Sequence, residues 1–156
     1  MYGKVDRISQ EAPVPIVSIG QKEFKPGGAA NVALNLAGLG ARVTLMGIVG
    51  KDGYNENLKN CLKGENKIDY KVIESGSRPT SVKTRIIADN RQLARLDNEV
   101  TDEISDKDVL ALKDSIAENI KDIDGVIMQD YNKGLLTPAL IENIIDRANE
   151  NEVPVY

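Results

Sequence analysis

The sequence contains no histidine and no tryptophan, and it has one phenylalanine and one cysteine among 156 residues. Without histidine, these residues cannot form a Ser-His-Asp or Cys-His catalytic centre, or a zinc site with histidine ligands. Aromatic residues make up only 4% of the chain, so its core must be mainly aliphatic. An apolar content of 41% beside 28% charged residues is typical of a folded domain and argues against disorder.

Long apolar runs and dense basic blocks are also missing. The net charge is −4, which excludes the clustered Lys and Arg that a nucleic-acid backbone or an anionic membrane demands. No stretch approaches the ~20 apolar residues of a membrane span, and residues 1–10 lack the apolar centre of a signal peptide. Cys61 has no partner for an internal disulfide, and we expect it to be a buried or half-buried helix residue. The composition therefore predicts a soluble cytoplasmic protein.

The apolar residues form two kinds of pattern. Residues 29–40 are apolar on nearly every side, which predicts a largely buried helix that ends at Gly40. Residues 43–49 form a continuous apolar run, typical of a parallel strand covered on both faces. The remaining patterns predict helices over 52–63, 105–120 and 139–149, and strands over 67–73, 80–88, 92–96, 125–128 and from 153 onward.

Turn and cap residues refine these boundaries. Two prolines in residues 13–20 indicate an edge strand or a lid strand. Asn90 in the link between 80–88 and 92–96 supports a β-hairpin. Ser105 and the pair Thr137-Pro138 mark helix starts. Strands that alternate with helices predict an α/β layered domain with a largely parallel sheet.

The segment Gly27-Gly28-Ala29-Ala30-Asn31 is the richest candidate for ligand binding. Its two glycines permit backbone conformations closed to other residues, and the following helix offers free N–H groups. The amide of Asn31 can donate to and accept from a sugar hydroxyl. The alternative is a tight turn into a buried helix, with Asn31 only capping it. No Gly-Lys-Ser or Gly-Lys-Thr follows, so the segment is not a phosphate P-loop.

Three motifs carry a resemblance to a known family. From Gly27 to Gly50 the chain resembles the first signature of the ribokinase-like (PfkB) carbohydrate kinases. The run from Arg7 to Pro15 resembles the lid segment of the D-glycero-D-manno-heptose 7-phosphate kinases, the kinase part of bifunctional ADP-heptose synthases, with Gln10 as its one departure. The segments 90–97 and 130–134 resemble two further motifs of that subfamily.

The resemblance implies a partial ribokinase-like (Rossmann-like) three-layer fold with a mostly parallel sheet and β lid strands. Residues 1–156 would form the N-terminal portion of a single sugar-kinase domain, with lid strands at about 5–24 and 80–97. The parent enzyme would transfer the γ-phosphoryl group of ATP, with Mg²⁺, to the anomeric hydroxyl of heptose 7-phosphate in ADP-heptose and lipopolysaccharide core biosynthesis. The family pattern also implies a possible homodimer through the lid strands.

The resemblance assigns roles to individual residues. Gly27, Gly28 and Asn31 would hold the sugar ring. Arg85 and Arg95 on the expected hairpin would neutralise the 7-phosphate, because a guanidinium fork suits phosphate oxygens. The alternative is that each is a solvated arginine paired with Asp89, Asp97 or Glu99.

Asp130 and Lys133 follow the expected strand 125–128. Open α/β sheets bind ligands just past the carboxyl ends of parallel strands, so we expect both residues to contact substrate. The alternative is a helix cap and a surface lysine.

Several parts of the family pattern are missing from this sequence. The first sheet strand with its Gly-Asp substrate contact, the Gly-Ala-Gly-Asp segment with the catalytic aspartate, and the ATP-binding loops are not identifiable. Phosphoryl transfer needs positioned phosphates and a group that orients the nucleophile. We therefore expect residues 1–156 alone to be inactive, with no bound cofactor. Alternatives are a related kinase for another sugar or sugar phosphate, and a non-catalytic sugar-binding or oligomerisation module.

Overall fold

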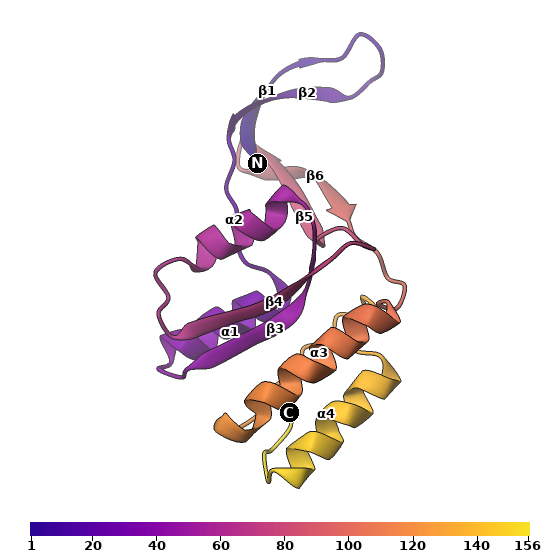
Figure 1. Cartoon of the computed structure of the whole chain (residues 1–156). Coiled ribbons are helices and arrows are strands. Elements are labelled where there is room, and N and C mark those ends of the chain that lie inside the picture. The colour runs from indigo at the N-terminus through magenta and orange to yellow at the C-terminus, as the bar shows by residue number, and fades with distance from the viewer.

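The computed structural model describes residues 1–156, which form a layered body and a smaller sheet that projects from it (Figure 1). The strands are β1 (Tyr2–Ile8), β2 (Pro15–Gln21), β3 (Val43–Gly50), β4 (Ile68–Ser75), β5 (Val82–Ala88) and β6 (Arg91–Asn98). The helices are α1 (Gly28–Gly38), α2 (Gly53–Leu62), α3 (Asp106–Asn119) and α4 (Pro138–Glu150), with a 3₁₀ turn η1 (Ile120–Asp122).

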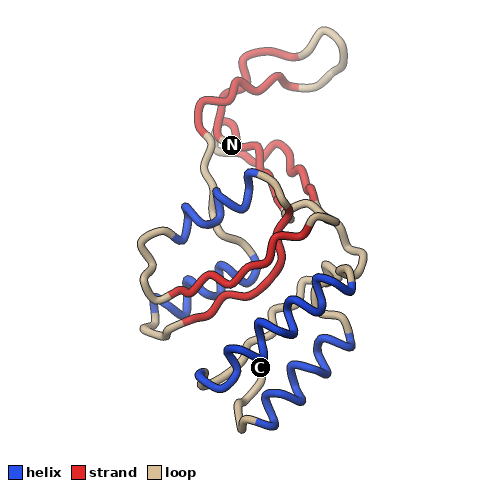
Figure 2. The backbone as a smooth tube through the Cα atoms, viewed as in Figure 1, coloured by secondary structure: helices blue, strands red, loops and turns tan.

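The body has three layers around the parallel pair β3–β4 (Figure 2). Successive strand residues point to opposite faces, so both faces of this pair carry apolar side chains. On one face Leu45 packs with Ala30 and Ala33 of α1 and Leu62 of α2. On the other face lies a second cluster, formed by α3, α4 and their connections: Ile104, Leu112, Leu140 and Ile144, with Ile48 and Ile73 against it.

Local sequence explains where the helices begin and how closely they pack. The buried face of α1 consists of alanines (Ala30, Ala33 and Ala37), whose small side chains let the helix lie close to β3. In α3 the Ser105 side chain accepts a hydrogen bond from the Asp108 amide, and in α4 Thr137 does the same for Leu140. These caps satisfy N–H groups that have no partner inside the helix.

The smaller sheet has the strand order β2-β1-β5-β6. It therefore brings residues 2–21 together with residues 82–98. β1 runs antiparallel to β2 and parallel to β5, while β5 and β6 form an antiparallel hairpin. Asp89 and Asn90 link β5 to β6 with φ angles of 49° and 60°, the left-handed conformation of a tight two-residue hairpin turn. The outermost strand at one edge is β2, which begins at Pro15.

The structure confirms most of the elements expected from the sequence, including the edge strand near 13–20, the 80–96 hairpin and both caps. Cys61 is half-buried in α2, as expected. The strand expected over 125–128 pairs in parallel only with residues 154–156, through a bridge between Val126 and Val155 and three backbone hydrogen bonds. It is not the buried strand that the sequence predicted, because Ile127 is 48% exposed. No helix is long and apolar enough to cross a membrane.

Candidate functional site

The N-terminus of α1 is open and carries no acidic residue. Gly27 occupies the cap position in an extended conformation, and no side chain caps the helix. Gly28 has a φ of 53°, which strongly favours glycine. Asn31 in the first turn is exposed. The positive end of the helix dipole can therefore attract an anionic or hydroxyl oxygen of a ligand, to which the free N–H groups can donate hydrogen bonds.

The loop 130–134 packs against this helix end. The ring of Tyr131 lies 3.6 Å from the point where a Cβ on Gly28 would sit, which is an ordinary van der Waals distance. The Asp130 carboxylate accepts a hydrogen bond from the Asn132 amide at 2.6 Å, which shapes the loop as a turn. Asp130 remains exposed, and Lys133 is partly exposed. The structure thus brings together two segments that are a hundred residues apart in sequence.

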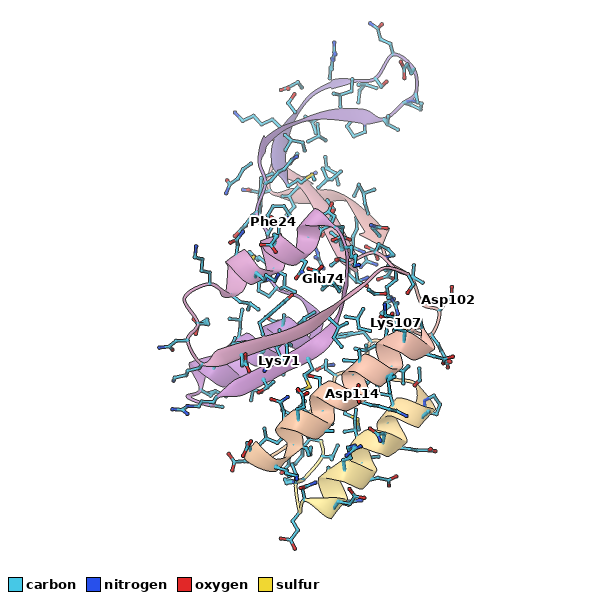
Figure 3. The ribbon with its side chains drawn as sticks, in the orientation of Figure 1. Phe24, Lys71, Glu74, Asp102, Lys107 and Asp114 are labelled. Atoms are coloured by element: carbon cyan, nitrogen blue, oxygen red, sulfur yellow. The ribbon has the colours of Figure 1, made fainter.

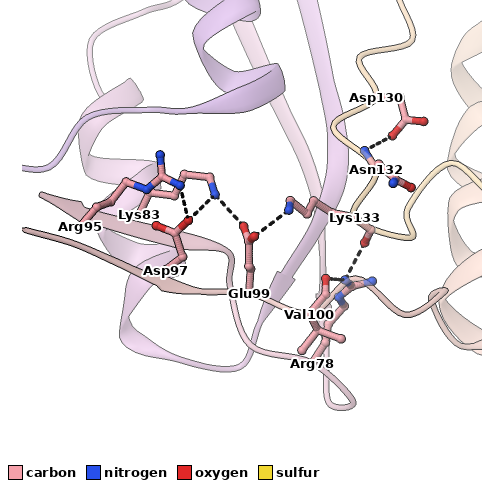
Figure 4. A network of polar contacts seen from close by, with 9 residues as sticks. All are labelled: Arg78, Lys83, Arg95, Asp97, Glu99, Val100, Asp130, Asn132 and Lys133. Carbon is pink, nitrogen blue, oxygen red and sulfur yellow. Dashed lines mark hydrogen bonds and ion pairs between the residues drawn. The ribbon is translucent and has the colours of Figure 1, made fainter.

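A chain of ion pairs connects the loop to the smaller sheet (Figure 4). The Lys133 ammonium lies 2.6 Å from a Glu99 carboxylate oxygen, and Lys83 bridges Glu99 at 2.8 Å and Asp97 at 3.1 Å. Arg95 closes the chain with a 3.0 Å contact to Asp97. Lys133 and then Lys83 lower the pKa of Glu99, and Lys83 lowers that of Asp97, so both stay ionised at neutral pH.

Arg85 and Arg95 face each other across the hairpin. Their Cα atoms are register partners in the β5–β6 pair, and both residues are exposed. Arg95 has Asp97 as a partner, whereas the Arg85 side chain makes no ion pair. Like charges directly opposite on a sheet repel, which favours a bound anion between them.

The connection from β4 to β5 is held by polar contacts that the sequence did not reveal. Asp52 caps α2 through the Tyr54 amide and also accepts hydrogen bonds from the Thr80 amide at 2.9 Å and the Thr80 hydroxyl at 2.7 Å. Thr80 in turn accepts one from the Gly50 amide. These contacts fix where β5 leaves the body.

Sequence reasoning named Gly27, Gly28, Asn31, Asp130 and Lys133, and the structure places these residues around the α1 N-terminus and the adjacent loop. It missed Tyr131, which makes the contact between the two segments, and the linking pair Lys83 and Glu99. An aromatic residue inside the 130–134 motif was the one signal for Tyr131. Lys83 and Glu99 looked like ordinary surface charges.

No group of three or more acidic, histidine or cysteine side chains converges on a possible metal position in residues 1–156. The cationic groups around the loop suit anionic oxygens instead.

A carbohydrate-kinase family model, described as "pfkB family carbohydrate kinase", matches residues 1–156 in full. The chain belongs to the pfkB family of carbohydrate kinases. Its curated relatives include the "Bifunctional protein HldE" of Helicobacter pylori strain G27, which is 43% identical over 151 residues, covering 97% of this chain and 33% of the relative. The protein of the same name from Geobacter sulfurreducens is 38% identical over 155 residues, covering 99% of this chain and 32% of the relative.

This pfkB family chain thus spans about a third of the length of the curated relatives it matches. A carbohydrate kinase from Agrobacterium tumefaciens superposes with a TM-score of 0.71 at 20% identity, covering 99% of this chain and 48% of the solved one. The chain therefore has a ribokinase-like α/β fold that corresponds to about half of such a structure.

Proposed function

We propose that the protein carrying this chain is a kinase that phosphorylates heptose 7-phosphate at its anomeric hydroxyl, in ADP-heptose and lipopolysaccharide core biosynthesis. One observation carries the proposal: Tyr131 of the loop 130–134 lies beside Gly28 at the start of α1, while Lys133 of the same loop is linked through Glu99 and Asp97 to the cations of β5 and β6. Groups suited to sugar hydroxyls and groups suited to a phosphate thus belong to one connected surface. The heptose assignment rests on the subfamily motifs, and the relatives named HldE support it.

The sugar would bind at the α1 N-terminus. Gly27 and Gly28 give a ligand close access to the main chain, and the amide of Asn31 can donate and accept at once. Asp130 accepts hydrogen bonds, and Lys133 donates them. Together these residues would orient the ring so that its anomeric hydroxyl faces the phosphoryl donor.

The 7-phosphate would bind between Arg85 and Arg95. Binding there would relieve the repulsion between the two opposed guanidinium groups, each of which offers a fork of donors to phosphate oxygens. Asp97 pairs with Arg95, while Arg85 has no acidic partner.

ATP with Mg²⁺ would supply the phosphoryl group and neutralise charge on it. The residues of this chain would bind and orient the sugar phosphate. We expect residues 1–156 alone to show no kinase activity. The use of ATP and the lone cysteine are consistent with a cytoplasmic enzyme.

The test is ATP consumption by the gene product at its natural length, assayed with heptose 7-phosphate, fructose 6-phosphate and ribose. Selective turnover of the heptose phosphate is the expected result. Turnover of another sugar would keep the kinase and discard the heptose assignment. Turnover of none would favour a non-catalytic sugar-binding or oligomerisation module.

Three variants then test the assigned contacts. Arg95→Ala and Lys133→Ala should each raise the KM for the sugar phosphate by about tenfold or more, because each removes charge-assisted hydrogen bonds. Arg85→Gln should do the same while leaving stability unchanged or slightly higher, since it removes one of two opposed cations. Lys4→Gln on β1, an exposed residue outside the network, is the control.

We also propose that two copies of the protein pair through the smaller sheet. One face of this sheet is apolar. Successive residues of a strand point to opposite faces, and register partners on neighbouring strands point to the same face, so apolar residues of neighbouring strands gather on one side. On that face Ile19 is 41% exposed and Leu96 is 57% exposed. The opposite face carries the charged groups Lys83, Arg85, Arg95 and Asp97.

A further inference from the structure

Arg78 holds two segments of the chain that are far apart in sequence. One of its guanidinium nitrogens donates to the carbonyl oxygen of Val100 and to that of Lys133, each at 2.7 Å. The side chain is partly buried and makes no ion pair. A half-buried cation that is satisfied by two carbonyl groups, and not by a carboxylate, depends on both of those groups staying in place.

The two segments meet at several other points. After β6, the Ile104 amide donates to the Gly134 carbonyl at 3.0 Å, and Glu99 pairs with the Lys133 ammonium. A Cβ on Gly134 would lie only 2.0 Å from the Asp102 carbonyl oxygen, so the backbones touch there. Asp102 lies near the first turn of α3 (Figure 3). Residues 99–104 therefore form a strap along the loop 130–134, and Arg78 lies where the two meet.

Arg78 itself is anchored to the body. Its segment is fixed on one side by the Ser75 hydroxyl, which donates to Asp108 at 2.8 Å, and on the other by the contacts of Thr80 with Asp52. Pro79 follows Arg78 and restricts its backbone. The guanidinium thus extends from a fixed point toward two segments that each lead to a proposed ligand group.

We propose that Arg78 is a positioning residue for the sugar phosphate, an inference that rests on the proposed function. Its two hydrogen bonds hold the main chain of Lys133 beside Val100, in the segment that follows β6 (Figure 4). Strand β6 carries Arg95. The distance between the cation at the sugar and the cations at the phosphate is then fixed by Arg78. Arg78 contacts main-chain carbonyl groups, and not the Lys133 ammonium or the Arg95 guanidinium.

The experiment uses the gene product at its natural length, with Arg78→Met and Arg78→Lys as variants. Arg78→Met should raise the KM for the sugar phosphate by about tenfold, with the KM for ATP changed by less than about twofold. Arg78→Lys should recover part of the loss, because an ammonium can donate to one of the two carbonyls. Arg42→Met, an exposed arginine before β3 with no hydrogen bond or ion pair, is the matched control.

A second measurement does not depend on substrate. Amide hydrogen exchange over residues 99–104 and 130–136 should be faster in Arg78→Met than in the wild type, and unchanged in Arg42→Met. Loss of thermal stability with an unchanged KM in the folded fraction would make Arg78 merely structural and overturn the proposal. A wild type that turns over no sugar phosphate would refute the proposed function, and unchanged exchange in Arg78→Met would separately refute the role of Arg78.

Discussion

Asp108 is a buried carboxylate surrounded by serine hydroxyls. It is 5% exposed, and one of its oxygens accepts hydrogen bonds from Ser75, Ser105 and, at 3.4 Å, Ser77. Burial opposes its ionisation, but the hydrogen bonds from Ser75, Ser105 and Ser77 outweigh burial and lower the pKa of Asp108 below its usual value of 3.8. The carboxylate thus joins the end of β4 to the start of α3.

A folded pKa below the unfolded one gives a definite pH dependence. The ionised group stabilises the fold above pH 3.8, and this contribution is lost as the pH falls through the folded pKa. Asp108→Asn should lower the free energy of unfolding by about 1–3 kcal/mol at neutral pH. The difference from wild type should shrink below pH 3.8, because asparagine does not titrate.

Urea unfolding of wild type and Asp108→Asn at a series of pH values measures this difference. Asp106→Asn, in the same first turn of α3 but with no side-chain contact, controls for the helix dipole. A difference that stays constant down to about pH 2 would mean that the Asp108 charge does not contribute to stability.

The sequence predicted Ser105 as the α3 cap with Asp108 three residues on, because both lie within one helical turn. It did not predict that Ser75 and Ser77 complete the cluster. Those residues are about thirty positions away, and only the packing of α3 on β4 brings them near. Polar clusters of this kind follow from the tertiary arrangement and leave no local pattern.

At the scale of elements, Asp52 connects the start of α2 to the segment that leads into β5. Asp52 caps α2 and holds Thr80, the second residue before β5. Asp52→Ala should lower the free energy of unfolding by about 2–3 kcal/mol, because it removes a cap and two charge-assisted hydrogen bonds. Asp52→Asn keeps one acceptor oxygen and should cost about half as much.

Chemical denaturation of the two variants tests this expectation. Glu56→Ala, in the first turn of the same helix, removes an exposed carboxylate that pairs with Lys59, so its effect should stay below about 1 kcal/mol. If Asp52→Ala were no worse than Glu56→Ala, the contacts at Thr80 would add nothing to stability.

Elements with strong local signals were predicted well. The continuous apolar run gave β3, and Thr137-Pro138 gave the start of α4. β1 was not predicted as a separate strand, because its apolar residues Tyr2, Val5 and Ile8 are three positions apart and do not alternate with polar ones. The apolar run at 125–128 predicted a buried strand, but this run pairs only with residues 154–156 and joins neither sheet.

At the scale of the whole molecule, the smaller sheet has an exposed apolar face where we propose that two copies pair. Leu96→Asp should convert the dimer of the natural-length protein to monomers, because it places a charge in the buried interface. Leu110→Asp on α3, at a similarly exposed leucine outside this sheet, should not. Light scattering coupled to gel filtration measures the mass of each. A monomeric wild type at micromolar concentration would contradict the pairing.

The family and fold class were predictable from the sequence because the glycine and asparagine signature has fixed spacing. The sequence predicted that the loop 130–134 and the start of α1 both bind substrate, because ligands bind past the carboxyl ends of parallel strands. It did not predict which residues of the two segments meet. The ion-pair chain from Lys133 to Arg95 was not predicted. Its members come from three segments, and their contacts depend on how the smaller sheet sits against the body.

The smaller sheet also constrains the order in which the chain acquires structure during its synthesis. β1 pairs with β5, where Tyr2 is the register partner of Ile87, 85 positions further along the chain. At ~5–20 residues per second a ribosome needs on the order of 4–17 seconds to add that length. For that time the β1–β2 hairpin waits with one open edge, which is a hazard for aggregation. Proline and charged residues on edge strands discourage pairing with other chains. The hairpin has both, with Pro15 on β2 and Lys4 and Asp6 on β1.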